Sequence, residues 1–334
     1  MLFLLFSCGS GTTGAEDPKT TFLNSIANLG KGFLDVFTSL SDMVAGAFGI
    51  NAETKKSDIG NYFTSIENTM TSVKEKLQDQ VTKNGNYEKV KTVVDKFITN
   101  TLDKIAEGAK EAAKGATGSD AIGGATTAGQ DAVAADTTSV NLLVKGIKEI
   151  VGVVLKDGDG DATKTKDEQQ KTIGKLLGAN ANSTDAEAAA ASASIGAVTG
   201  ADILQSIAKS GETANNDVEI EKAKNAAEIA AAKKEANKEI KDEAQKDAVI
   251  AAGIALRAMA KDGKFAAKTE EKSANAVNGV AASAVNKTLS TLIIAIRNTI
   301  DSGLKTSSDA LAAVKQEDKS ADVNTPVDAA TSGQ

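Results

Sequence analysis

The chain has 334 residues, of which 25% are charged and 41% hydrophobic, with a net charge of −7 and neither histidine nor tryptophan. The lack of histidine removes the usual general base at neutral pH, the Ser-His-Asp type of nucleophile and most zinc sites, and so argues against most enzyme chemistry. The acidic balance argues against nucleic acid as the main partner, and the single cysteine allows no internal disulfide.

The chain begins with an apolar run, MLFLLFS, which ends at the only cysteine, Cys8. This boundary is typical of a bacterial lipoprotein signal, in which a peptidase cuts before the cysteine and acyl chains are attached to its thiol and its new amine. Leu5 and Ser7 fit the cleavage pattern, whereas Phe6 is bulky. Only seven residues, none of them basic, precede Cys8, so we expect the true start to lie upstream. The alternative is a free thiol near a start codon.

We therefore predict that residues 1–7 are the remnant of a lipoprotein signal peptide, that Cys8 is the lipid attachment site and that residues 8–20 form a lipidated tether. The tether contains Gly9-Ser10-Gly11-Thr12-Thr13-Gly14, which matches a dinucleotide-binding motif, with Asp35 about the expected 20 residues further on. That motif needs a βαβ unit, and no segment with strand periodicity supplies one. We interpret the glycines as part of a flexible tether and predict no cofactor.

Three helices are predicted in the first third of the chain. Apolar residues recur every three or four positions from Phe22 to Phe48, from Ser57 to Val81, and from Tyr87 to about Lys114. Eight of the eleven aromatic residues lie between residues 22 and 97, so we expect the firmest core there. No run approaches the roughly 20 apolar residues that a membrane helix needs.

Residues 98–247 contain no aromatic side chain and are rich in alanine, glycine, threonine and aspartate. We expect weak helices and loops here, able to vary without collapse of the core. Within this stretch, residues 217–247 show frequent Glu–Lys pairs four positions apart, which predict a long, solvated, highly charged helix.

The last third of the chain is again strongly apolar. The sequence predicts a helix over 249–259 interrupted only by Arg257, a turn over 261–264 with Phe265 behind it, and a final amphipathic helix along Leu289 to Leu304. Altogether we predict one all-α domain over residues 21–325 and a polar tail over 326–334.

The stretch KDGDGDATKTKDEQ, residues 156–169, comes close to a calcium-binding loop. Asp157, Asp159 and Asp161 fall at positions 1, 3 and 5, and Glu168 falls at position 12. However, Ala162 replaces the glycine of position 6 and Lys164 replaces the apolar residue of position 8. We interpret this stretch as a polar surface loop between two helices and predict no metal site.

Three parts of the sequence carry a resemblance to a known family. They are FLNSIANLGKGFLDVFTSLSDMVAGAFGI (22–50) with KKSDIGNYFTSIENTM (55–70), VKGIKEIV (144–151), and above all AAGIALRAMAKDGKFAAK (251–268). These stretches resemble the variable large protein, or variable major protein, lipoproteins of relapsing-fever Borrelia, and the related variable surface lipoprotein of Lyme spirochaetes. The resemblance covers about half of the chain and leaves the middle unaligned.

The resemblance implies an elongated helical ectodomain, lipid-anchored to the outer membrane through Cys8, with both termini at the membrane-proximal end. It implies an antigen that is displayed to host antibodies and replaced in antigenic variation, with residues 98–247 as the variable part. The alternative is an adhesin, or a lipoprotein that binds host serum proteins, on the same displayed face. We predict no enzyme and no nucleic-acid partner, and leave a weak homodimer open.

Overall fold

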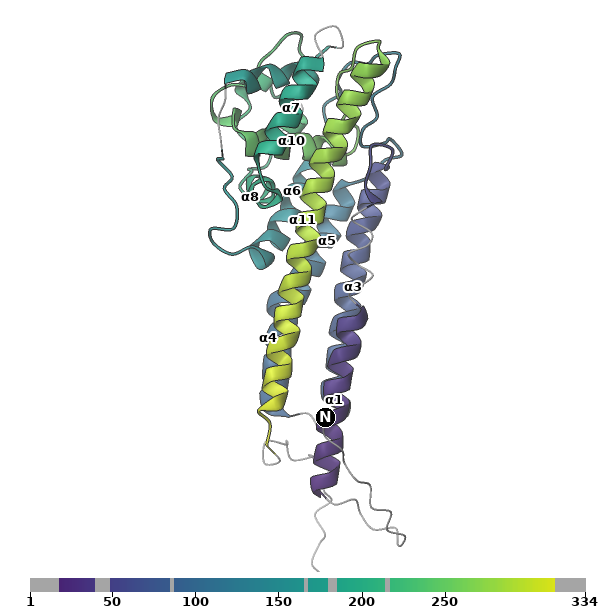
Figure 1. Cartoon of the computed structure of the whole chain (residues 1–334), viewed down its shortest axis with the longest axis vertical. Coiled ribbons are helices and arrows are strands. Elements are labelled where there is room, and N and C mark those ends of the chain that lie inside the picture. Colours follow the sequence, from purple (N-terminus) through teal and green to yellow (C-terminus); the bar gives the residue numbers. More distant parts are fainter. Residues whose placement is uncertain are drawn as a thin grey trace, which may run out of the picture.

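The computed structural model describes residues 18–39, 49–84, 87–164, 168–179, 185–213 and 217–315. Helices form nearly all the regular structure of this described part, and only three isolated bridges pair extended residues in it. The prediction of an all-α fold is confirmed. The molecule is elongated, with long helices along its main axis and a cluster of shorter helices at one end (Figure 1). We call the long helices the stalk and the cluster the head.

The stalk contains α1 (Pro18–Ser39), α3 (Lys56–Lys83), α4 (Glu88–Phe97), α5 (Asp103–Gly115) and α11 (Glu271–Ala312). One π-helical turn, η2 (Ile98–Leu102), joins α4 to α5. At a rise of 1.5 Å per residue, the 42 residues of α11 span about 63 Å, so this helix runs through both head and stalk (Figure 1).

Two of the three predicted stalk helices agree with these bounds. The helix predicted over 57–81 is α3, and the helix predicted over 87–114 is α4, η2 and α5 taken together. The helix predicted over 22–48 is present as α1 up to Ser39, and its remaining part, residues 40–48, lies outside the described residues. The helices predicted around 249–259 and 289–304 are α10 (Asp247–Met259) and part of α11.

The head contains α6 (Thr137–Val154), α7 (Asp185–Ala197), α8 (Gly200–Ala208), α9 (Ala226–Ala231) and α10. Three short 3-10 segments connect them: η3 (Glu168–Leu177), η5 (Ile220–Lys222) and η6 (Asp242–Ala244). The expectation of weak helices and loops over residues 98–247 was wrong for α6 and α8, which place large apolar side chains at the centre of the core. These fully buried residues are Val140, Leu143, Ile147, Ile150, Ile203, Leu204 and Ile207.

The prediction of a long charged helix over 217–247 was also wrong. The structure has only η5, the six-residue α9 and η6 in this range. The alanines that the pattern placed on a solvated helix are buried instead, among them Ala226, Ala230 and Ala232. Its Glu–Lys pairs form across turns, as between Glu221 and the lysines Lys238 and Lys241, at 2.6 and 2.8 Å.

The helices α5 and α6 pack closely through two glycines. A Cβ atom on Gly146 would lie 2.3 Å from the main-chain oxygen of Gly108, and a Cβ atom on Gly108 would lie 2.7 Å from the oxygen of Gly146. Real Cβ atoms do not approach backbone so closely. These positions therefore require glycine for the observed helix separation.

By length and composition alone, α11 is long and apolar enough to cross a membrane. However, half of its most apolar window is buried within the protein. Buried side chains such as Leu289, Ile293 and Ile296 face the bundle core. Its apolar character is thus largely that of a core helix.

Candidate functional site

The two ends of the described chain lie at the same end of the stalk. The helix α1 begins there and α11 finishes there (Figure 1). Near this end Leu29 and Leu311 are both buried, and a Cβ atom on Gly30 would lie 3.8 Å from Leu311 Cδ2. The first and last stalk helices therefore pack together at what we call the base.

The predicted anchor lies just before this base in sequence. Cys8, the signal remnant and the glycine motif are outside the described residues, as is the predicted tail 326–334. The predicted tether over 8–20 extends slightly too far, because α1 already begins at Pro18. Nine residues, 9–17, therefore separate Cys8 from Pro18, the first residue of α1.

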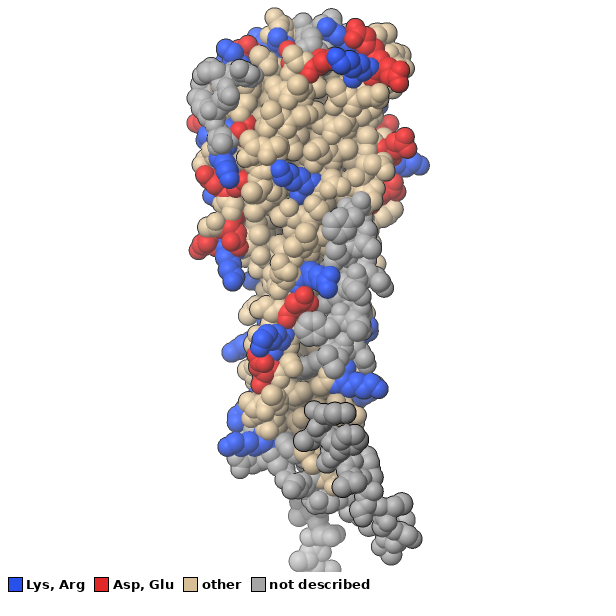
Figure 2. Space-filling view, in the orientation of Figure 1, with Lys and Arg blue, Asp and Glu red and all other residues tan. Residues whose placement is uncertain are grey.

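At the opposite end of the molecule, loops connect the ends of helices (Figure 1), and main-chain hydrogen bonds hold residues 116–136 in place. Residues 116–136 lie between the loop before α3 and the turn after α10, with bridges from Lys55 to Ala121 and from Val133 to Lys264. On the visible face, charged side chains gather at this far end, whereas the area over the upper half of α11 carries few charges (Figure 2).

The aspartate- and glycine-rich loop is exposed from Lys156 to Asp159, as predicted for a surface loop. Its carboxylates are turned toward the loop's own backbone. Asp159 Oδ2 accepts a hydrogen bond from the amide of Lys156 at 2.9 Å. Asp161 Oδ1 accepts from the amide and hydroxyl of Thr163 at 2.8 and 2.7 Å, and these bonds lower the pKa of Asp161.

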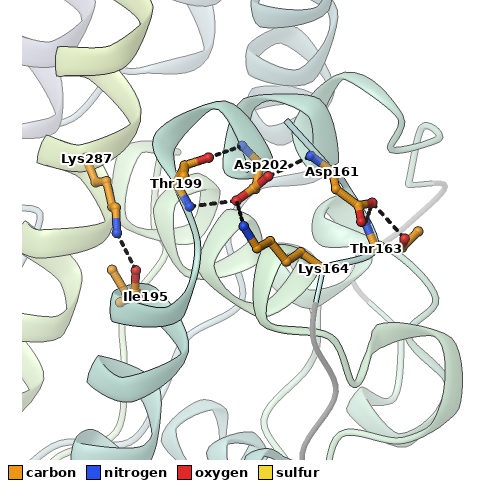
Figure 3. A network of polar contacts seen from close by, with 7 residues as sticks. All are labelled: Asp161, Thr163, Lys164, Ile195, Thr199, Asp202 and Lys287. Atoms are coloured by element: carbon orange, nitrogen blue, oxygen red, sulfur yellow. Dashed lines mark hydrogen bonds and ion pairs between the residues drawn. The ribbon is translucent and has the colours of Figure 1, made fainter. Parts of the chain in front are cut away.

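An aspartate outside the loop, Asp202, joins the loop to the start of α8 (Figure 3). Its carboxylate accepts hydrogen bonds from the amides of Asp161 and Thr199 at 2.6 and 2.7 Å, and Lys164 Nζ lies 3.5 Å from Oδ2. Burial alone would raise the pKa of Asp202, but the hydrogen bonds lower it overall. Ala162 is buried, and its φ is not positive. These acids therefore act as turn and cap residues; the side chain of Glu168 is outside the described part.

Two cations are fully buried where the head meets α3. Lys56, the first residue of α3, donates from Nζ to the main-chain oxygens of Arg257 and Ala258, at 3.2 and 2.5 Å. These oxygens belong to the last turn of α10, the negative end of that helix. Burial lowers the pKa of Lys56 to about 7.

Arg257 continues this arrangement into the next helix. Its Nε donates to the oxygen of Lys264 at 3.0 Å, and Nη1 donates to the oxygens of Ala230 and Ala232, both at 3.1 Å. Its guanidinium carbon lies 6.0 Å from the centre of the Phe265 ring. Burial lowers the pKa of Arg257, but a guanidinium starts so high that it stays charged at neutral pH.

Lys287 on α11 repeats the pattern on α7. Its Nζ donates to the oxygen of Ile195 at 2.7 Å, in the last turn of α7 (Figure 3). Three head helices thus end against a cation supplied by another element. In the sequence, Arg257 stands out as the one interruption of an apolar helix, whereas the pattern around Lys56 and Lys287 did not predict their contacts. A lysine opening a helix is unfavourable for that helix's own dipole, so the position of Lys56 was a usable signal.

A groove of about 560 Å³ lies between α11, the π-helical turn η2 and the residues that end and follow α6. The groove is lined by Thr101 of the π-helical turn, by residues of α11 such as Ser302, and by Leu155 and Lys156 after α6. Its lining contains hydroxyl, amide and apolar groups with one lysine and one aspartate. It brings together none of the predicted site residues except Asp159.

Known proteins resemble this chain in both sequence and architecture. The sequence profile of a family described as Borrelia lipoprotein matches residues 33–329. The chain is 65% identical to Variable large protein 4 and to Variable large protein 17 of Borrelia hermsii, over 100% of the chain and 97% and 96% of those proteins. It is similar to the crystal structure of the Lyme disease variable surface antigen VlsE of Borrelia burgdorferi, with a TM-score of 0.77 and 36% identity, over 88% of the chain and all of VlsE.

Proposed function

The chain belongs to the Borrelia lipoprotein family, and from this premise we propose that it is a cell-surface antigen that is replaced by other versions in antigenic variation. The observation that carries the proposal is the full-length 65% identity to two variable large proteins. The fold shared with VlsE, named as a variable surface antigen, supports the same function.

We further propose that acyl chains on Cys8 anchor the protein to the outer leaflet of the outer membrane. The base, where α1 begins and α11 ends, then faces the membrane and the charged loops point away from it (Figures 1 and 2). With nine residues between them, Cys8 and Pro18 could be up to about 35 Å apart when the chain is extended. This length suffices to cross the polar headgroup layer.

We propose that the variable surface lies on exposed positions of residues 98–247, and not on the whole of that stretch. The buried faces of α6 and α8 contribute to the core, so substitutions there carry a packing cost of several kcal/mol. Exposed residues such as Lys156, Asp157, Lys209 and Glu212 carry no such constraint. Substitution at surface positions of this kind usually changes stability by less than about 0.5 kcal/mol.

No catalytic role is part of this proposal, and host antibodies are the expected partners. The adhesin alternative needs a contiguous apolar patch. The exposed large apolar residues of the described part, Leu23, Val133 and Ile294, lie on three separate elements. Their separation gives the alternative no support.

Protease treatment of intact spirochaetes tests the proposed display. Trypsin added to living cells should remove the protein from whole-cell immunoblots while a periplasmic marker stays intact. If the protein resists trypsin on intact cells but is cleaved after detergent lysis, the outer-surface assignment is wrong. Binding of the full chain to host matrix or serum proteins, measured on the same preparation, would instead favour the adhesin.

A further inference from the structure

The hydrogen bonds of the two buried cations share one chemical property. Lys56 and Arg257 donate only to main-chain oxygens in the hydrogen bonds described above. Every residue of any sequence carries such an oxygen. These hydrogen bonds therefore depend on where the main chain places its oxygens, mostly at helix ends, and not on which side chains those residues bear.

The two cations act in series. Lys56 joins the first turn of α3 to the last turn of α10, and Arg257 joins α10 to the end of α9. These partners are far apart in sequence, 201 residues for Lys56 and Arg257. Since both side chains are 0% exposed, water cannot replace the contacts when one of them is lost.

We propose that Lys56 and Arg257 form an internal joint that ties the first turn of α3 to α10 and α9 through hydrogen bonds to main-chain oxygens, so that side chains in the head can be exchanged without breaking those hydrogen bonds. The benefit of exchanging side chains in the head rests on the proposed function. The existence of the joint does not, because the joint is a property of the fold.

The helix ends explain how the joint tolerates buried charge. A buried cation is costly unless its donors are satisfied, and the last carbonyl groups of a helix carry both free acceptors and partial negative charge. Main-chain oxygens satisfy Nε and Nη1 of Arg257, whereas Nη2 is buried without a hydrogen-bond partner among the described residues. The same carbonyl groups would be left buried without donors if the cation were removed. Loss of either side chain should therefore loosen α9 and α10 before it affects the distant stalk.

Amide hydrogen exchange of the full chain, followed by mass spectrometry, tests the joint. Lys56→Met and Arg257→Met should each raise exchange at least tenfold across residues 226–259 and leave the lower half of α3 and α4 unchanged. Lys55→Met is the matched control, because Lys55 is the exposed neighbour of Lys56. If Lys56→Met behaves like Lys55→Met, or if exchange rises equally in α4, the proposed joint is wrong.

Arg257→Lys covers the case in which the methionine variants do not fold. It keeps the charge but replaces the planar fork by a single nitrogen, so it cannot contact all four main-chain oxygens that Arg257 contacts, those of Ile229, Ala230, Ala232 and Lys264. Exchange should then rise around α9 more than around α4. Equal exchange in the variant and the parent chain would overturn the role of Arg257.

A second group of variants tests whether the joint ignores side chains. Lys264 supplies an oxygen to Arg257, while its own side chain is 38% exposed and pairs with Asp120 at 3.3 Å. Lys264→Ala and Lys233→Ala should leave exchange over 226–259 unchanged. A tenfold increase in either would show that the joint depends on side-chain identity. Trypsin accessibility on intact cells is a separate measurement, so failure of the joint and failure of the proposed display can be told apart.

Discussion

Lys56 Nζ lies 3.2 Å from the main-chain oxygen of Arg257, and neither side chain is exposed. The charged groups that act on Lys56 are Asp120 and Asp262, which raise its pKa, and Arg257 and Lys264, which lower it; burial exceeds all four in effect. The hydrogen bonds of Lys56 to α10 therefore stabilise the fold, whereas burial of its positive charge destabilises it.

This opposition predicts that stability depends on pH through Lys56. The pKa of Lys56 is about 7 in the folded protein and 10.5 in its ordinary state. Between these values the unfolded chain binds more protons, so the free energy of unfolding rises with pH. The slope is about 1.4 kcal/mol per pH unit at most. A neutral amine keeps two N–H donors, so both carbonyl contacts survive deprotonation.

Urea unfolding at pH values from 6 to 10 measures this effect as the difference between the parent chain and Lys56→Met. The difference should move in favour of the parent chain as the pH rises above 7. Lys55→Met, compared in the same way, should show no trend. A flat difference across the range would mean that Lys56 keeps its ordinary pKa when folded.

Phe265→Ala should lower the free energy of unfolding by about 3–5 kcal/mol, because Phe265 is 1% exposed and lies against Arg257. Ile294→Ala removes a side chain that is 46% exposed and should cost much less. Denaturant unfolding of the two variants side by side decides the point. Equal losses would place Phe265 outside the core.

The predictable parts of the fold were those in which local pattern and tertiary packing agree. The apolar spacing of α3, α4, α5 and α10 placed each helix within a few residues of its true bounds. The prediction for residues 217–247 failed because their Glu–Lys spacing fits a solvated helix, whereas in the structure tertiary contacts end α9 at Ala231. Arg257 donates hydrogen bonds to the carbonyl oxygens of Ala230 and Ala232. Asn237 has a positive φ of +56°, which does not fit a continuous helix.

The buried cations were hard to predict for a related reason. Lys56 and Lys287 each contact a helix end that is far away in sequence, 201 and 92 residues respectively. A single sequence gives no sign of which distant carbonyl groups will lie nearby. The resemblance to a known family identified the segments around Lys56 and Arg257, and the structure supplies the contact between them.

Gly146→Ala should destabilise the protein by about 1–3 kcal/mol. The added Cβ atom would lie 2.3 Å from the oxygen of Gly108 and 2.4 Å from the amide nitrogen of Ala112, both of them backbone atoms. Gly152 provides a control on the same helix, since a Cβ atom there would meet nothing within 4 Å. Gly152→Ala should stabilise by about 0.5–1 kcal/mol through helix propensity. Melting temperatures that shift in the same direction for both would contradict the close packing of α5 and α6.

Cys8→Ala should release the protein from the membrane fraction of cells that express it behind a complete signal peptide. Each buried methylene of an acyl chain contributes about 0.8 kcal/mol, so a multiply acylated cysteine holds the membrane effectively permanently. Within the described residues, the one helix apolar enough to span a bilayer is α11, and half of its apolar window is already buried in the protein. Without acyl chains, a protein of net charge −7 has little to hold it at an anionic surface. Fractionation after a high-salt wash measures the release, and Ser7→Ala, which keeps a small residue before the cysteine, should remain bound. Retention of the Cys8→Ala protein in the washed membranes would show that another part of the chain supplies the anchor.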